Sequence, residues 1–169
     1  MCFRNKIILV TGAGQNTGLG IAARFAAEGA TVFLNDRTRQ AVNRALATLR
    51  RRGCKRLVGV PGDISVPADV EAMFQQIATK AKRLDVLVNN AAHLGVGPEF
   101  LETKLAFFEA VVRVNLVGTF HVSQQAAGLM KRRGGGVIIN LGSNVSTRAI
   151  RQRSAYLASK GGLDALTLA

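Results

Sequence analysis

The stretch IILVTGAGQNTGLG, from Ile7 to Gly20, decides the fold class of this chain. Its four apolar residues predict a buried strand, and the four glycines in the next ten residues predict a turn. Glycine is costly to order, because it loses more backbone freedom on folding than any other residue. A strand, a glycine-rich turn and a helix beginning near Gly18 form an anion site, where backbone N–H groups and the positive end of the helix can approach a pyrophosphate. The glycines are therefore expected to give a dinucleotide access to the backbone.

Asn16 stands where the commonest form of such a loop has a glycine. Asparagine tolerates left-handed backbone better than most non-glycine residues, so Asn16 is expected to replace glycine in that conformation. Its amide is then available to the loop or to the cofactor.

The rest of the chain alternates between short apolar runs and segments with helical spacing. Near-continuous apolar runs recur at residues 31–35, 57–60, 86–89 and 137–141, as is typical of parallel strands covered on both faces. The pattern predicts a single Rossmann-like domain over residues 1–169, with a doubly wound parallel sheet of about five strands and helices on both faces. The last helix is expected to begin near Ser154 as its N-cap, and the sequence stops at Ala169 inside it.

Composition is that of an ordinary globular protein, with 48% hydrophobic and 20% charged residues. No uninterrupted apolar run of membrane-spanning length and no signal peptide is recognised, so neither a membrane nor export is expected. Cys2 and Cys54 form neither a disulfide framework nor a metal site, and no metal is expected. A cytoplasmic location is the prediction.

The formal charge of +13 comes from 23 Lys and Arg against ten Asp and Glu. The basic residues are spread along the chain, at 50–52, 80–83, 131–133 and 148–153, and several fall at expected helix C-termini, where cations meet the negative end of the dipole. A solvated structural role is the main interpretation. An anionic substrate or an acyl carrier is the alternative, and a nucleic-acid partner is not expected.

Cofactor preference depends on the residues that end the second apolar run, Asn35-Asp36-Arg37. An acid about 20 residues beyond the glycine loop accepts hydrogen bonds from an adenosine ribose 2′-hydroxyl and repels a 2′-phosphate. Asp36 therefore favours NAD. Arg37 would attract a 2′-phosphate, so NADP stays open.

Tyr156 and Lys160 are four residues apart in SAYLASKGG and share one face of a helix. A phenol, with a reference pKa of about 10, is a poor acid–base catalyst at neutral pH. An ammonium about 4 Å away stabilises its phenolate by at most about 4 kcal/mol at an effective dielectric of 20. The pair is therefore a candidate proton donor and acceptor for alcohol–ketone chemistry.

Over essentially its whole length, the sequence resembles the classical short-chain dehydrogenases/reductases. The resemblance rests on the glycine loop TGAGQNTGLG, on Asp63 and Ile64 in GDIS, on NNAA at 89–92 with Ala92 in place of a glycine, on Asn115, on Ser143 thirteen residues before Tyr156, and on Tyr156 with Lys160.

The resemblance implies a role for each of four catalytic residues. Tyr156 would exchange a proton with the substrate oxygen, and Ser143 would hydrogen-bond that oxygen. Lys160 would support the phenolate and hold the nicotinamide ribose. Asn115 would kink its helix and hold a water that links Lys160 to solvent. Cofactor contacts are expected from Gly12, Gly14, Gln15, Asn16, Thr17, Gly18, Leu19, Asp36, Arg37, Asp63, Ile64, Asn89, Ala91, Tyr156 and Lys160.

The function implied is an NAD(P)-dependent oxidoreductase that interconverts a secondary alcohol and a ketone, similar to 3-oxoacyl reductases or to sugar and steroid alcohol dehydrogenases. Family members normally continue into a sixth strand, a substrate-covering lobe and a seventh strand, which this sequence lacks. A truncated dinucleotide-binding module with little or no activity is therefore the alternative. If the full fold is present, a homo-oligomer, dimer or tetramer, is expected through a long helix from about residue 104 to 133 and the helix after Ser154.

Overall fold

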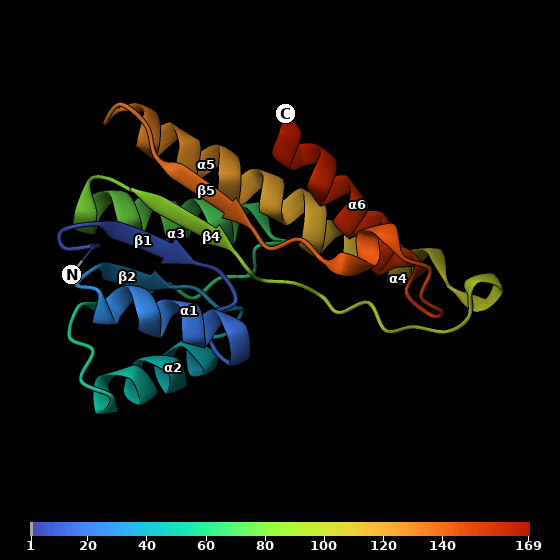
Figure 1. Ribbon diagram of the computed structural model, residues 1–169, viewed down its shortest axis with the longest axis horizontal. Coiled ribbons are helices and arrows are strands. Elements are labelled where there is room, and N and C mark those ends of the chain that lie inside the picture. Colours follow the sequence, from blue (N-terminus) through green and yellow to red (C-terminus); the bar gives the residue numbers. More distant parts are fainter. Residues whose placement is uncertain (1) are drawn as a thin grey trace.

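The computed structural model describes residues 2–169 and contains one sheet of five parallel strands in the order β3-β2-β1-β4-β5 (Figure 1). The strands are β1 (Ile7–Val10), β2 (Thr31–Leu34), β3 (Leu57–Gly59), β4 (Val86–Asn89) and β5 (Val137–Asn140). The predicted doubly wound sheet is confirmed, with β2, β3 and β5 each one residue shorter than their apolar runs. The strand order reverses between β1 and β4, and the carboxyl ends of the strands at such a point are where α/β sheets bind ligands.

Helices cover the sheet in two layers. α1 (Asn16–Ala27) and α2 (Arg39–Arg51) lie on one face, and α3 (Pro67–Ala81) and α5 (Thr119–Lys131) lie on the other (Figure 1). Because side chains alternate along a strand, Ile8 and Val10 of β1 pack in the first layer and Leu9 in the second. Because both faces of the central strands are covered by helices, both faces carry apolar side chains.

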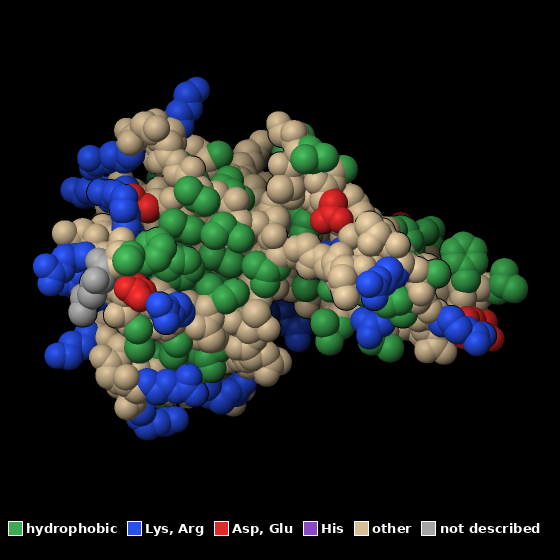
Figure 2. All heavy atoms as spheres, in the orientation of Figure 1, with side chains coloured by type: hydrophobic (Ala, Val, Ile, Leu, Met, Phe, Trp, Pro, Cys, Tyr) green, Lys and Arg blue, Asp and Glu red, His purple; other side chains and the backbone are tan. Residues whose placement is uncertain are grey.

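The edge strand β5 is an exception to the expectation that every strand is covered on both faces. Val137 pairs with Val86 and Ile139 with Val88, so both point to the face of α1 and α2, yet they are 55% and 42% exposed. Figure 2 shows apolar side chains on this face, in the part of the view where β4 and β5 lie. The expectation is wrong for β5 because α1 and α2 cover the other half of this face, over β1, β2 and β3.

The helix expected over residues 104–133 is divided by a π-helical turn. α4 (Leu105–Val112) leads into the π-turn η2 (Arg113–Gly118), and α5 continues from it. By length and composition, the whole stretch Leu105–Lys131 could cross a membrane, a criterion that the core helix of a globular protein also meets. In the fold it packs against α3, β4 and α6.

The last helix, α6 (Ser154–Leu168), packs against α4, η2 and the 3₁₀ turn η3 (Asn144–Thr147). Ser154 is its first helical residue, and Arg153 is the N-cap, without a side-chain capping bond. The prediction of Ser154 as the N-cap is therefore wrong. A second 3₁₀ turn, η1 (Phe100–Glu102), lies in the connection between β4 and α4.

Candidate active site

The glycine loop is shaped by close contact with the end of β4. Gly12 has a φ of 61°, and a Cβ on it would lie 2.7 Å from the Cα of Ala91. A Cβ on Gly18 would collide with the carbonyl oxygen of Gly12. The glycines therefore let the loop and the start of α1 pack closely against neighbouring atoms. This is a second role, beside the access of a dinucleotide to the backbone that the sequence predicts. Asn16 has a φ of 48°, which confirms the left-handed conformation expected for it.

Asn90 holds the loop in place. Its Nδ2 donates to the carbonyl oxygens of Thr11 at 2.9 Å and Gly12 at 3.0 Å. In return, the hydroxyl oxygen of Thr11 accepts from the backbone N–H groups of Asn90 and Ala91, both at 3.1 Å. The two strand ends at the switch point are thus tied together by four hydrogen bonds.

Asn89, which the sequence favoured as a cofactor contact, points elsewhere. It is buried, and its Nδ2 donates to Ser123 Oγ at 2.9 Å and to Asn140 Oδ1 at 2.8 Å, under α5 and beside β5. Asn90 lines the cavity instead. The alternation of side chains along an extended segment is the signal that separates the two asparagines, because neighbours face opposite sides.

A cavity of about 500 Å³ opens at the carboxyl ends of the strands, beside the glycine loop. Ten of the predicted cofactor residues line it: Gly12, Gln15, Asn16, Thr17, Gly18, Asp36, Arg37, Asp63, Ile64 and Ala91. Five others lie outside its lining: Gly14, Leu19, Asn89, Tyr156 and Lys160. The sequence did not single out Asn35, Gly62, Asn90 or Val114, which also line the cavity. Residues scattered over four loops therefore meet at one site.

Two carboxylates stand at the wall of this cavity. Asp36 accepts from the backbone N–H of Gly14 at 2.9 Å and from that of Arg37 at 2.8 Å. Asp63 accepts from the backbone and the hydroxyl of Ser65, at 2.9 and 2.7 Å. Each carboxylate is oriented by these bonds and keeps lone pairs for a further donor.

Asn115 connects the π-turn to the loop after β4. It is buried, its Oδ1 accepts from the backbone N–H of His93 at 2.7 Å, and its Nδ2 donates to the carbonyl of His93 at 3.0 Å. The same Nδ2 lies 3.0 Å from Ser159 Oγ, and that hydroxyl bonds the carbonyl of Tyr156 at 2.8 Å. Asn115 thus reaches the first turn of α6 through one intermediate side chain.

Tyr156 and Lys160 come together on α6 as their spacing predicts. The Lys160 Nζ lies 5.8 Å from the centroid of the Tyr156 ring and donates to the carbonyl of Leu141 at 2.5 Å. Lys160 is buried, with 4% of its surface exposed. Burial lowers the pKa of its ammonium below the usual value, and the charge of Asp164 opposes that change.

A second cation lies beside the same ring. Arg153 has its guanidinium carbon 5.8 Å from the Tyr156 ring centroid, and its Nη1 donates to the carbonyl of Leu94 at 2.6 Å. Leu94 also lines the cavity. Arg153 therefore joins the loop after β4 to the start of α6.

Ser143 lies between β5 and η3, and η3 packs against α6. It is half-buried and caps η3, with its Oγ 3.4 Å from the backbone nitrogen of Val145. Because the Oγ is the acceptor of this bond, the hydroxyl proton is free to be donated to a ligand. Ser143 thus begins a turn that packs against α6, the helix that carries Tyr156 and Lys160.

Three comparisons with known proteins agree with this architecture. The family model described as short chain dehydrogenase matches residues 6–169. A 3alpha-hydroxysteroid dehydrogenase from Mediterraneibacter gnavus is 32% identical over 168 residues, an alignment that covers 99% of this chain and 67% of that protein.

Solved structures give the same result. NAD⁺-bound xylitol dehydrogenase superposes with a TM-score of 0.93 at 31% identity, covering 99% of this chain and 64% of that one. A variant of actinorhodin polyketide ketoreductase with NADPH gives a TM-score of 0.91 at 34% identity, covering 96% and 62%. The chain therefore spans about two thirds of the length of the proteins it matches.

Proposed function

The chain belongs to the short-chain dehydrogenase family, and on that basis we propose that it carries the cofactor site and catalytic residues of an NAD(P)-dependent oxidoreductase. The reaction is the interconversion of a secondary alcohol and a ketone. One observation carries the proposal: Tyr156 stands on α6 with the ammonium of Lys160 5.8 Å from its ring centroid, at the same end of the sheet as the glycine-loop cavity.

The cavity suits a dinucleotide in chemistry as well as in place. The loop after β1 presents a backbone that close packing restricts to glycine at Gly12, and the start of α1 adds the positive end of a helix dipole for a pyrophosphate. Asp36 and Asp63 offer oriented acceptors for ribose hydroxyl and adenine amino groups. A bound nicotinamide would supply the hydride chemistry.

The protein's own residues would handle the proton and the developing charge. Tyr156 would donate its phenolic proton to the substrate oxygen in reduction and accept it back in oxidation. Ser143 would donate a hydrogen bond to that oxygen. Lys160 would stabilise the phenolate, and Asn115 would fix the loop of His93 relative to α6 through Ser159.

We favour NAD over NADP as the cofactor. The Asp36 carboxylate stands at the cavity wall and is fixed by two backbone N–H groups, so a negatively charged 2′-phosphate would meet a charge that cannot swing away. Arg37 is exposed at the same wall and is the residue that would support NADP.

The substrate is proposed to be a small alcohol or carbonyl compound. An anionic or carrier-linked compound is the form that Arg153 beside Tyr156 would favour. The location is proposed to be cytoplasmic, where the free thiols of Cys2 and Cys54 would stay reduced.

Association into a homo-oligomer is proposed through the exposed apolar side chains of the α4–α5 stretch. Leu105, Val117 and Phe120 are 70%, 54% and 48% exposed on that helical surface. A dimer or tetramer in size-exclusion chromatography with light scattering would support this assignment, and a monomer at all concentrations would contradict it.

A second candidate is a dinucleotide-binding module with little or no turnover. It is favoured by the bond of Lys160 Nζ to the Leu141 carbonyl, which uses one of the three donors of the ammonium, and by the exposed apolar face of β5.

The deciding experiment uses the purified 169-residue chain. NADH and NADPH are titrated by cofactor fluorescence, and NADH oxidation is then followed with a panel of ketones for the chain and for Tyr156→Phe. Turnover that Tyr156→Phe abolishes, with NADH affinity nearly unchanged, supports the enzyme. NADH binding without turnover favours the binding module. Equal turnover in the variant would refute the role proposed for Tyr156.

A further inference from the structure

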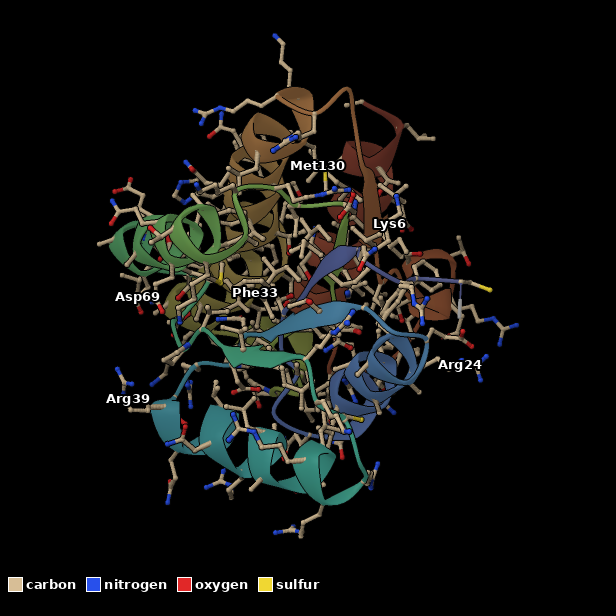
Figure 3. All side chains as sticks on the ribbon, turned by 90° about the vertical axis from the view of Figure 1, so that its left-hand side faces the viewer. Lys6, Arg24, Phe33, Arg39, Asp69 and Met130 are labelled. Atoms are coloured by element: carbon tan, nitrogen blue, oxygen red, sulfur yellow. The ribbon has the colours of Figure 1, made fainter. Side chains whose placement is uncertain are left out.

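The amino end of the sheet, where the strands begin and the helices end, carries most of the positive charge of the protein. Because all five strands are parallel, the C-termini of α1, α2, α3 and α5 and the loops that follow them open at this one end. Fourteen of the 23 Lys and Arg residues lie there, in residues 4–6, 50–56, 80–83 and 131–133 together with Arg24. Lys and Arg side chains project there at the left edge of Figure 2, and Figure 3 looks directly onto this end.

Only two of the ten acidic residues share this end, and both are already paired. Glu28 lies 2.8 Å from Arg24, and Asp85 pairs with Arg83 and, at 3.8 Å, with Lys6. Over residues 2–169, the other eleven basic residues at this end have no carboxylate within ion-pair distance. The amino end thus has a formal charge of +12, whereas all the other residues together, those of the cavity included, have +1.

Helix dipoles do not account for this excess. Each helix C-terminus carries the equivalent of about half a negative elementary charge, so four helix ends offset only about two positive charges. Several of the cations, such as Arg4, Lys55 and Arg56, also lie in loops outside the helices. The remaining charge is available to a partner.

The spread of the cations indicates a long polyanion rather than a small anion. The five strands, about 4.8 Å apart, make this end about 19 Å wide before its helices are added. A duplex, with one phosphate charge per about 1.7 Å of axis, would meet several basic segments at once. Nine of the fourteen residues are arginine, whose planar fork matches phosphate oxygens.

Two other partners fit this end less well. Single strands are usually held by stacking on exposed aromatic rings, but Phe3 at this end is half-buried and packs edge-on against Phe25, with centroids 4.9 Å apart. Membrane surfaces are usually bound by one amphipathic helix with an apolar face, whereas these cations lie on separate loops and helix ends.

We propose that the amino end of the sheet is a docking surface for double-stranded nucleic acid, which it holds through the phosphate backbone without reading sequence. No nucleic-acid partner is expected from the sequence, which lacks a recognisable reading motif and spreads its basic residues along the chain, whereas the fold gathers fourteen of them at one end. The surface lies opposite the cofactor cavity, so both can be occupied together.

The test is fluorescence anisotropy of a labelled 20-base-pair duplex titrated with the full chain between 50 and 200 mM salt. Binding is expected to weaken as salt rises, with the slope of log K against log salt near −0.9 for each phosphate neutralised. Replacing Arg50, Arg51 and Arg52 together by glutamine should reduce the steepness of that slope by about 2 to 3. Replacing Lys131, Arg132 and Arg133 by glutamine should reduce the slope by a similar amount, although α5, at whose end they lie, is on the opposite face of the sheet from α2.

The matched control removes the same charge from the carboxyl end, with Arg39→Gln, Arg113→Gln and Arg148→Gln, all exposed in the native chain. It should leave the slope unchanged, and circular dichroism should show every variant folded. A control that weakens binding as much as the Arg50–Arg52 variant would overturn the proposal, because net charge alone would then explain the binding. A second result would also overturn it. If the chain bound phosphatidylserine vesicles and added duplex did not reduce that binding, this end would be assigned to a membrane surface.

Discussion

The side chain of Asp36 and the backbone of Gly14 are joined by one hydrogen bond, with Oδ2 2.9 Å from the nitrogen. This bond fastens the glycine loop after β1 to the end of β2, two segments that are 22 residues apart. The contact depends on the missing side chain of Gly14, because a Cβ there would lie 2.5 Å from the same oxygen. The residue expected to choose the cofactor is therefore positioned by the loop expected to hold the pyrophosphate.

Gly14→Ala is expected to weaken NADH binding, because the new methyl group pushes the Asp36 carboxylate out of place. The measurement is an NADH fluorescence titration of the variant. Gly20→Ala is the matched control, since nothing lies within 4 Å of a Cβ on Gly20. It should bind NADH normally and gain up to about 1 kcal/mol of stability from better helix propensity. Equal NADH affinity in native chain and Gly14→Ala would show that the position of Asp36 does not matter for binding.

Asn115→Ala is expected to destabilise the fold by about 2–3 kcal/mol. It removes the partner of the part-buried His93 backbone N–H and carbonyl and one of the two bonds of the buried Ser159 hydroxyl, and each unsatisfied buried group costs about 1–3 kcal/mol. Urea unfolding measures the change. Asn144→Ala, at an exposed position in η3, should change the free energy of unfolding by less than about 0.5 kcal/mol. A similar loss in both variants would contradict the structural role of Asn115.

Lys160 should make the stability of the chain depend on pH in the alkaline range. Burial lowers the pKa of its ammonium in the folded state below the usual 10.5, so the unfolded chain binds more protons between the two values. The free energy of unfolding contributed by this residue therefore rises with pH across that window. The measurement is urea unfolding of the native chain and of Lys160→Met between pH 7 and 11, which gives the difference in their free energies of unfolding at each pH. If that difference were flat across pH, it would rule out a buried ammonium at this position.

Asp85 should stabilise the amino end of the sheet above acid pH. Burial alone would raise the pKa of its carboxyl, but the Arg83 hydrogen bond, the Ile7 N–H and the charges of Arg83 and Lys6 outweigh it and lower the pKa below 3.8. The stabilisation is then fully present above about pH 4 and is lost as the pH falls through the folded pKa. Asp85→Asn should cost on the order of 1–3 kcal/mol at pH 7 and much less in strong acid. A cost that is the same at pH 7 and pH 2 would contradict the ion pairs.

Arg153 is expected to favour substrates with a negative charge. If turnover is observed, Arg153→Gln should raise the KM of a carboxylate-bearing ketone about 10- to 100-fold, the worth of one charge-assisted hydrogen bond. A neutral ketone should be affected far less. Arg148→Gln, exposed in the same loop, is the control. An equal loss with both ketones would mean that Arg153 acts only by holding the loop at Leu94.

The fold could be read from the sequence because its main signals are local. Apolar runs such as Val86–Asn89 and the glycine turn after Val10 fix strands and a loop through their own residue types. Left-handed backbone at Asn16 follows from the chemistry of asparagine alone. The spacing of Tyr156 and Lys160 placed them on one face because a helix has a fixed pitch.

The tertiary structure alone decided where side chains point and which distant segments meet. Only the packed strands show that Asn90 faces the cavity and Asn89 faces Ser123, and that the Lys160 ammonium reaches the carbonyl of Leu141. Basic residues that are scattered along the chain lie together at one end because parallel strands bring every helix C-terminus to the same side. Local sequence sets backbone preference through interactions within a few residues, whereas these arrangements depend on the direction in which each segment enters the sheet.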